Sequence, residues 1–353
     1  MDKIKNLQSA LENGCAYLVT SPENRRYLTD FPSSDGYVLI TKTEAVLLID
    51  SRYIEAAQNS AKGCTDIILL TSLSAQLPEL IEKLDIVTVY TEAEKLSVSE
   101  YQNFCKIIPC ECIAEKADDE INALRRRKNE TEKQKILDAQ ASAEKAFDHI
   151  LGFIKEGITE REIALTLDFF MLKNGAEAIS FETIAVSGKN SSMPHGVPGD
   201  KKIEKGDFIT LDYGAVVDGY HSDMTRTVAV GFVSDKQAEV YETVLTAQKK
   251  SLEILRAGVS GFDADAAARD VIKSAGYGEF FGHGTGHGVG IEIHEQPRLS
   301  LKSKQILEIG DVVTVEPGIY LPSEFGVRIE DMAFITENGC ENLTKSPKNL
   351  IIL

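Results

Sequence analysis

The sequence contains an internal repeat, and this repeat limits the fold more than any other feature. The segment Ile203-Glu-Lys-Gly-Asp-Phe-Ile-Thr-Leu-Asp-Tyr-Gly214 is matched, 104 residues further along, by Leu307-Glu-Ile-Gly-Asp-Val-Val-Thr-Val-Glu-Pro-Gly318. Five of the twelve positions are identical, and the strand positions are apolar in both copies. Each copy follows two helical stretches that end at glycines, namely Gly157, Gly175, Gly258 and Gly276. Two such αα-ββ halves predict a pseudo-two-fold domain with one site shared between them.

Each copy of the repeat places a carboxylate at the end of an apolar strand, where an unpaired charge is costly. These carboxylates belong to Asp212 in the first half and Glu316 in the second. In the first half, Asp218-Gly219 is a strong signal for a two-residue hairpin. This hairpin would set Asp212 opposite Thr225 and would bring Asp223 to the same face of the sheet.

In the second half, the loop Pro322-Ser-Glu-Phe-Gly326 reverses the chain, so that Glu330 comes opposite Glu316. Four carboxylates from two hairpins are therefore expected to converge. Like charges pack together only when they are protonated or bind cations, and two divalent ions would neutralise four carboxylates. The alternative, four separate surface or ion-paired acids, does not explain why two hairpins repeat the arrangement.

A glycine-rich segment supplies imidazole side chains. Three of the six histidines in the chain, His283, His287 and His294, lie within twelve residues of one another. Glycines flank the first two and allow the backbone to approach a metal or a substrate closely. A fourth histidine, His195, lies in a loop between Pro194 and Gly196. A phosphate-binding role for the glycines is disfavoured because no Walker lysine follows and no strand precedes them.

The length of 353 residues is sufficient for two domains. Before residue 122, short strand-like runs alternate with helical ones, which predicts an α/β domain. The expected strands are Tyr37–Ile40, Ala45–Ile49, Asp66–Leu70 and Ile86–Tyr90, and the expected helices are Tyr53–Ala61 and Leu77–Lys83.

A charged segment, Glu115–Lys135, leads into the second domain, and its run Arg125–Lys128 is interpreted as a solvated helix face. Asn129 and Glu132 then have the spacing of a capping box, at the start of a helix that Gly157 is expected to end. Thr159, with Glu162, predicts the start of the next helix.

Composition excludes several classes of protein. A net charge of −17 disfavours nucleic-acid binding, because such a surface repels phosphate backbones. No stretch approaches the ~20 apolar residues of a membrane span, and the charged first residues do not resemble a signal peptide, so we expect a cytoplasmic protein without membrane contact. We expect reduced structural thiols at Cys15, Cys64, Cys105, Cys110, Cys112 and Cys340.

Taken together, the motifs of the second domain resemble those of the aminopeptidase P and prolidase family of "pita-bread" metallopeptidases. The residues that carry this resemblance are Met193–Gly196, Leu211–Gly214, Ser222–Thr227, Gly282–Gly288, Ile293–Glu295, Val315–Gly318 and Arg328–Asp331. More loosely, Asn24–Phe31 and Asp50–Tyr53 resemble the creatinase-like N-terminal domain of that family. The resemblance implies a creatinase-like α/β domain in residues 1–122 and an α+β pita-bread catalytic domain, with its pseudo-two-fold repeat, in residues 123–353.

The resemblance also implies a set of functional residues. Five residues would hold two divalent metal ions: Asp212, Asp223, His287, Glu316 and Glu330. The substrate site would be lined by His195, His283 and His294 and supported by Arg328. Glu316 is expected to act also as the proton shuttle, and His294 or His283 to stabilise the oxyanion. The oxygen-rich ligand set favours Mn²⁺, with Co²⁺ or Zn²⁺ as alternatives.

The expected activity is hydrolysis of the bond between an N-terminal residue and proline, by an Xaa-Pro aminopeptidase. The main alternative is an Xaa-Pro dipeptidase (prolidase), which uses the same metals. The lack of a long insertion in residues 180–330 favours an open cleft and therefore the aminopeptidase. A methionine aminopeptidase-like enzyme and a non-catalytic binding protein are weaker alternatives. A homodimer is expected from the resemblance alone, and His221 is left without a role.

Overall fold

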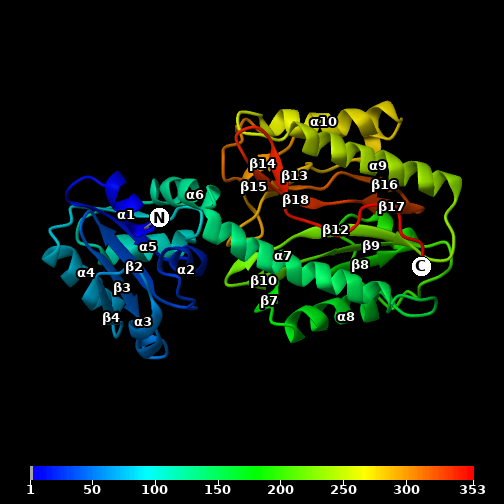
Figure 1. Cartoon of the computed structure of the whole chain (residues 1–353). Helices are drawn as coiled ribbons and strands as arrows, with labels where there is room; N and C mark the ends of the chain where they lie inside the picture. The colour runs from blue at the N-terminus through cyan, green and yellow to red at the C-terminus, as the bar shows by residue number, and fades with distance from the viewer. Residues whose placement is uncertain (1–2) are drawn as a thin grey trace. The chain divides into compact units, whose positions relative to one another are not determined.

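The computed structural model describes residues 3–353 (Figure 1). The chain divides into two compact units, one that ends at Arg125 and one that comprises Arg126–Leu353. The expected boundary between residues 122 and 123 falls inside helix α6 (Ala117–Arg126), shortly before this division. Within residues 3–353, no helix is both long and apolar enough to cross a membrane.

The first unit is built on one six-stranded sheet with the order β4-β3-β2-β1-β5-β6. Its strands are β1 (Cys15–Val19), β2 (Tyr37–Thr41), β3 (Ala45–Ile49), β4 (Asp66–Leu69), β5 (Thr88–Thr91) and β6 (Glu111–Ile113). Its helices, besides α6, are α1 (Lys3–Ala10), α2 (Pro22–Thr29), α3 (Ile54–Ser60), α4 (Leu73–Lys83) and α5 (Val98–Ile107). The predicted α/β character of this unit is confirmed.

The predicted strands are all present in this sheet, whereas the helix predicted from Leu77 begins earlier, at Leu73. Several elements were not anticipated, among them β1 and α2. The residues of β1 after Cys15 are buried, and β1 pairs with β5 in parallel and with β2 in antiparallel orientation. Helix α2 begins at an N-cap, Ser21, whose side chain accepts from the backbone N–H of Asn24.

The second unit contains two pairs of helices, one pair for each half of the repeat. These are α7 (Glu130–Leu151) with α8 (Glu160–Lys173), and α9 (Asp235–Ile254) with α10 (Gly261–Ser274). The capping box predicted at Asn129 and the helix start predicted at Thr159 are confirmed, and Thr159 with Glu162 forms a second capping box. The predictions that Gly157 and Gly258 end the two long helices were wrong, because α7 ends at Leu151 with Gly152 as its C-cap, and α9 ends at Ile254 with Leu255 as its C-cap.

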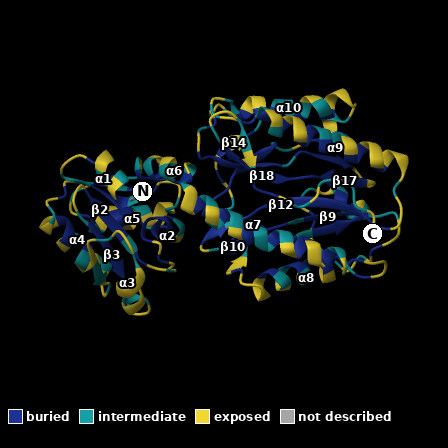
Figure 2. Cartoon of the chain, viewed as in Figure 1, coloured by how far each residue is buried: buried dark blue, intermediate teal, exposed yellow. Residues whose placement is uncertain are grey.

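The strands of the second unit form the layer between these helix pairs (Figure 1). The first half contributes β7 (Ala178–Ile179), β8 (Ile184–Ser187), β9 (Phe208–Tyr213), β10 (Ala215–Val217), β11 (Tyr220–His221) and β12 (Met224–Ala229). The second half contributes β13 (Gly286–Gly288), β14 (Glu295–Leu299), β15 (Val312–Val315), β16 (Gly318–Leu321), β17 (Phe325–Arg328), β18 (Asp331–Ile335) and β19 (Cys340–Asn342). Strands β9 and β12 are buried, whereas α8 and α10 expose their outer faces (Figure 2). The predicted pseudo-two-fold arrangement of helix pairs around hairpins is confirmed.

The run Arg125–Lys128 is not the solvated helix face that its charge suggested. The guanidinium of Arg126 pairs with the buried carboxylate of Asp311 at 2.7 Å. The ammonium of Lys128 pairs with Glu295 at 3.0 Å, and both of these side chains are almost fully buried. Arg126 and Lys128 are thus drawn in by acidic partners that lie 185 and 167 residues away in the sequence, where no local pattern predicts them, whereas Arg127 stays exposed.

Candidate metal centre and active site

The first hairpin brings Asp212 and Asp223 to one face of the sheet, as predicted. Strands β9 and β12 pair in antiparallel orientation with Asp212 opposite Thr225. The turn between β10 and β11 contains Asp218 and Gly219, both with positive φ, as a two-residue hairpin requires. Gly214 is required by close packing, because a Cβ at this position would lie 1.9 Å from the carbonyl oxygen of Ser222.

The second hairpin places Glu316 and Glu330 opposite each other. The ladder of β15 and β18 ends with Val315 opposite Asp331, and the ladder of β16 and β17 begins with Gly318 opposite Arg328. Glu316 and Glu330 occupy the facing positions between these two ladders. The register predicted for this hairpin is therefore confirmed.

The two hairpins and the histidine segment meet at a buried cluster of donor atoms. One ligand atom each from Asp223, His287 and Glu330 lie within 4.8 Å of one another, and all three residues are buried. The Nε2 atom of His287 lies 3.6 Å from Oδ2 of Asp223 and 3.4 Å from Oε1 of Glu316. Donors that share one ion at about 2.1 Å lie roughly 3 Å apart, so small adjustments would suffice for coordination.

The protonation behaviour of these groups fits a cation site. Burial, together with the charges of Asp212 and Glu316, raises the pKa of the Asp223 carboxyl well above its usual range. Burial and the charge of Asp223 do the same for the pKa of Glu330. Burial lowers the pKa of His287 to about 3, so its imidazole is neutral at physiological pH and can donate a lone pair. Bound cations would offset this repulsion among the carboxylates.

An orphaned oxygen supports the same conclusion independently. Oδ2 of Asp212 accepts from the guanidinium of Arg328 at 2.5 Å. The other oxygen, Oδ1, is buried and has no hydrogen-bond partner among the described residues 3–353. A buried carboxylate oxygen without a donor is costly unless it binds a cation. The residues present therefore fit the two divalent ions that the ligand set implied.

A hydrogen-bonded network extends from this cluster through a tyrosine that the sequence did not single out. The hydroxyl of Tyr320 accepts from Arg328 at 2.8 Å and lies 2.9 Å from Nε2 of His283. Nε of Arg328 donates to Thr225, whose hydroxyl in turn donates to Glu330 at 2.7 Å. His283 and Arg328 thus belong to one network with the carboxylates. Burial raises the pKa of Tyr320 to about 12, so this phenol keeps its proton.

The histidine segment is held in place by an ion pair on α10. Arg269 donates to the carbonyl oxygens of Phe281 and His283 at 2.8 and 2.7 Å. Its partner is the fully buried Asp265, which also accepts from the backbone N–H and the hydroxyl of Thr285. This pair fixes the backbone on both sides of His283 and immediately before the strand that carries His287.

Arg269→Met should therefore weaken metal binding by about 10–100-fold, the range typical of lost outer-shell partners. The affinity is measured by metal titration, together with the free energy of unfolding of the metal-free protein. Arg256→Met is the matched control, because Arg256 is exposed and follows α9 outside this network. Equal affinities in the two variants would contradict the positioning role of Arg269.

The cluster opens into a cleft with a volume of about 580 Å³. His195 and His294 are exposed and line the cleft together with the half-buried His283, as the resemblance implied. The ring of His294 lies edge-on to that of His287, with 4.4 Å between the centroids. Arg298, which sequence reasoning missed, also lines the cleft, and its side chain is exposed. Arg298 lies on β14, where buried and exposed residues alternate. This alternation places Arg298 on the exposed face, but only once the position of the strand is known.

His221, for which the sequence suggested no role, contributes its backbone to the site. It lies on β11 opposite Val216 of β10. Its N–H donates to the carbonyl oxygen of Gly290 at 2.8 Å. This hydrogen bond joins the first hairpin to the segment between His287 and His294.

Comparison with known proteins assigns both units. Residues 3–127 match the Creatinase/Prolidase N-terminal domain, and residues 134–337 match Metallopeptidase family M24. The chain belongs to metallopeptidase family M24. The expected family, fold class and metallopeptidase character are thereby confirmed, and membership of M24 implies bound divalent metal ions.

Several relatives in this family are similar over nearly the whole chain. An Xaa-Pro dipeptidase from Pyrococcus furiosus is 40% identical over 94% of this chain and 94% of its own length. The structure of an Xaa-Pro dipeptidase from Bacillus anthracis has a TM-score of 0.96 and 44% identity, and the match covers 100% of this chain and 99% of that one. The structure of an X-Pro aminopeptidase from Thermotoga maritima has a TM-score of 0.92 and 37% identity, with 98% and 100% coverage. The Xaa-Pro dipeptidases among these relatives favour the dipeptidase alternative over the aminopeptidase activity that we expected from the sequence.

Proposed function

We propose that this chain is a metal-dependent Xaa-Pro dipeptidase. The observation that carries the proposal is the combination, in one cleft, of the five-residue donor cluster with an exposed guanidinium at Arg298. The similarity to named Xaa-Pro dipeptidases supports it. A dipeptide ends in a carboxylate close to the bond that is cut, and arginine is well suited to bind a carboxylate through two hydrogen bonds.

The residues of the cluster have separate tasks in this proposal. Asp212, Asp223, His287, Glu316 and Glu330 would hold two divalent ions, which supply Lewis-acid polarisation and a water of lowered pKa. In the metal-free cluster, burial raises the pKa of the Glu316 carboxyl to about 8, and bound cations would lower it again, so that Glu316 would be ionised and able to accept a proton from water. Glu316 would take the proton from the attacking water and pass it to the leaving proline nitrogen.

The histidines and Arg328 would act on the substrate and its surroundings. His294 is exposed in the cleft beside His287 and would donate to the oxygen of the scissile carbonyl as charge develops there. His283 is already bonded to Tyr320, so it would act through the network that orients Arg328 and Asp212. His195 would close the cleft near the proline ring. The oxygen-rich donor set favours Mn²⁺, while the homodimer and the cytoplasmic location stay expectations.

A peptide panel tests the assignment of the dipeptidase. With added Mn²⁺, the enzyme should cleave Ala-Pro efficiently and should cleave Ala-Pro-Ala and Ala-Pro-amide at least about tenfold less well, because these lack the carboxylate at the proline. Arg298→Gln should lower kcat/KM for Ala-Pro by about 10–100-fold, because the charge-assisted pair between the guanidinium and the substrate carboxylate is lost. The values of kcat/KM for Ala-Pro-Ala and Ala-Pro-amide should stay unchanged.

Efficient cleavage of Ala-Pro-Ala by both proteins would instead establish the aminopeptidase, which the similarity to the Thermotoga maritima structure keeps as the second candidate. Met-Ala-Ala is the control for a methionine aminopeptidase. No hydrolysis of any peptide after loading with Mn²⁺, Co²⁺ or Zn²⁺ would refute a peptidase function altogether.

A further inference from the structure

Between β8 and β9, the chain forms a loop whose tip lines the catalytic cleft. This segment, residues 188–199, begins with the short helical turn η1 (Gly188–Ser192) and is the His195 loop. Its tip, residues 194–198, forms part of the cleft wall. His195 is exposed, and Val197 has an exposed fraction of 79%. Since these side chains are not fixed by packing, the direction of His195 has to be set where the loop begins and ends.

The carboxylate of Glu160 joins the two ends of the His195 loop. Glu160 is the first residue of α8 and is fully buried. Its Oε1 accepts from the backbone N–H and the hydroxyl of Ser187, directly before the loop, at 2.7 and 2.9 Å. Its Oε2 accepts from the N–H of Gly199, at the end of the loop, at 3.2 Å. The side-chain amide of Asn190 donates to both oxygens at 3.0 and 3.1 Å. Each oxygen therefore holds a different end of the loop.

The His195 loop is also bound to the second hairpin. The hydroxyl of Ser191 accepts from the N–H of Gly326 at 2.9 Å, and a Cβ at Gly326 would lie 2.1 Å from the carbonyl oxygen of Ser191. The carbonyl oxygen of Pro194 accepts from Arg328 at 3.3 Å, and Arg328 also donates to Asp212. The loop thus lies between Glu160 and the network of the metal centre, so a shift at Glu160 would move the segment that carries the histidine.

The second half of the repeat contains the same device. Asp265 on α10 is fully buried and accepts from the N–H and the hydroxyl of Thr285, two residues before His287. Strands β8 and β13 pair with β9 and β15, which are the equivalent strands of the two repeat copies. In both halves, a carboxylate on the second helix therefore holds a hydroxyl residue at the edge of a segment that carries a histidine of the cleft.

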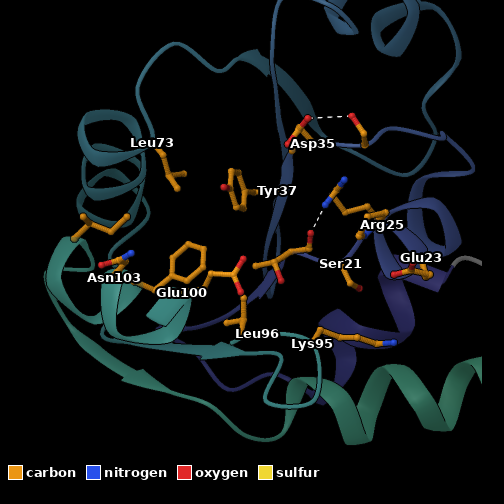
Figure 3. A pocket seen from close by; sticks show the side chains of 16 residues that line it. Ser21, Glu23, Arg25, Asp35, Tyr37, Leu73, Lys95, Leu96, Glu100 and Asn103 are labelled. Atoms are coloured by element: carbon orange, nitrogen blue, oxygen red, sulfur yellow. Dashed lines mark hydrogen bonds between the residues drawn. The ribbon is translucent and has the colours of Figure 1, made fainter. Parts of the chain in front are cut away.

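The first unit uses a similar device, beside a cavity of about 510 Å³ (Figure 3). Ser21, which lines this cavity, donates from its N–H and its hydroxyl to the buried carboxylate of Glu92, at 2.9 and 2.7 Å. The sequence before Arg126 contains no histidine, so the device alone has a structural role there. What distinguishes Glu160 is the loop that its carboxylate closes.

We propose that Glu160 is a positioning residue for the peptidase reaction, which holds the His195 loop so that the imidazole of His195 faces the substrate. The inference rests on the proposed function, because the contact of His195 with the substrate belongs to that proposal. Glu160 is not among the residues that line the cleft, so it would act only through the loop.

Hydrogen exchange in the metal-loaded, full-length protein tests the anchor without any need for activity. In Glu160→Gln, the new side chain can accept from Ser187 or from Gly199, but it turns an NH₂ group towards the other donor. The backbone amides of residues 188–199 should therefore exchange at least about tenfold faster than in the wild type, with unchanged rates elsewhere in the second unit. Glu162→Gln is the matched control, because Glu162 is exposed on the same turn of α8 and accepts from Thr159, where glutamine also completes a capping box.

Kinetics with Ala-Pro show whether the anchor acts through His195. Glu160→Gln should lower kcat/KM by about tenfold or more when His195 is present, and by less than about twofold in the His195→Ala background, where the residue to be positioned is absent. Asn190→Ala, which removes the donor on the side of the loop, should show the same pattern with a smaller loss. This variant decides the question if Glu160→Gln does not fold. Glu162→Gln should match its parent in both backgrounds.

A loss of kcat/KM by the same factor in both backgrounds would show a purely structural role for Glu160 and would overturn the proposal. Faster exchange throughout the second unit, or unchanged exchange in residues 188–199, would overturn it as well. A wild type that cleaves no peptide would overturn the proposed function, and with it the positioning of His195 for that reaction. The exchange rates would then still decide whether Glu160 anchors the loop.

Discussion

Glu316→Gln is expected to lower kcat for Ala-Pro by about 10²–10⁴-fold, the contribution typical of a positioned acid–base group. The amide keeps an oxygen that can bind a metal ion, but it cannot carry a proton from water to the leaving nitrogen. Glu316 lies 3.4 Å from His287 and accepts from the hydroxyl of Thr314, so the variant side chain has little freedom to move away.

The measurement for Glu316→Gln combines steady-state kinetics with the metal content of the same sample. Glu324→Gln is the matched control, because Glu324 is exposed in the turn of the same hairpin and pairs with the exposed Lys236. The control should retain full turnover. If Glu316→Gln retains more than a third of the wild-type kcat while its metal content is unchanged, Glu316 does not carry the proton.

His287→Ala is expected to have the second large effect, the loss of metal binding. His287 is buried, and its Nε2 points at the carboxylates of Asp223 and Glu316. Removal of this donor should weaken metal affinity by more than about 100-fold, beyond the range seen for outer-shell partners. The carboxylates would then lose both a neutral ligand and the cation that offsets their repulsion.

His294→Ala provides the contrast, because the two rings are in contact but only His287 belongs to the donor cluster. His294→Ala should retain its metal and lose turnover. Metal-to-protein ratios by elemental analysis, measured after dialysis at a fixed free-metal concentration, separate the two cases. If His294→Ala loses the metal and His287→Ala keeps it, the two roles are reversed.

Local sequence signals explain why the two hairpins could be predicted. The Asp218-Gly219 pair has a strong conformational preference, and it sets the register that places Asp212 opposite Thr225. Since side chains alternate along a strand, the register also determines which carboxylates face one another. The repeat then allowed the same reasoning to be applied to Glu316 and Glu330.

The residues that the sequence did not reveal act through contacts between distant segments. Asp265 and Arg269 lie on an ordinary helical face, and only the packing of α10 shows that they hold the backbone around His283. In the sequence, Tyr320 is indistinguishable from any other strand residue. Only the folded structure shows that its hydroxyl contacts Arg328 and His283. Arg298 was missed because it belongs to no motif, and the binding of a substrate carboxylate that we propose for it leaves no pattern in the sequence.

The buried pairs at the start of the second unit determine where the chain can be cut. A fragment that begins at Asn129 keeps the whole of α7 and every proposed metal ligand, and would be a natural choice for isolating the catalytic half. It would, however, leave Glu295 and Asp311 buried without Lys128 and Arg126. Loss of one partner of a buried pair costs about 3–5 kcal/mol, a large part of the stability of a typical domain. Glu295 directly follows His294, so the unpaired buried carboxylate would disturb the wall of the cleft. An isolated catalytic fragment therefore has to include Arg126 and Lys128.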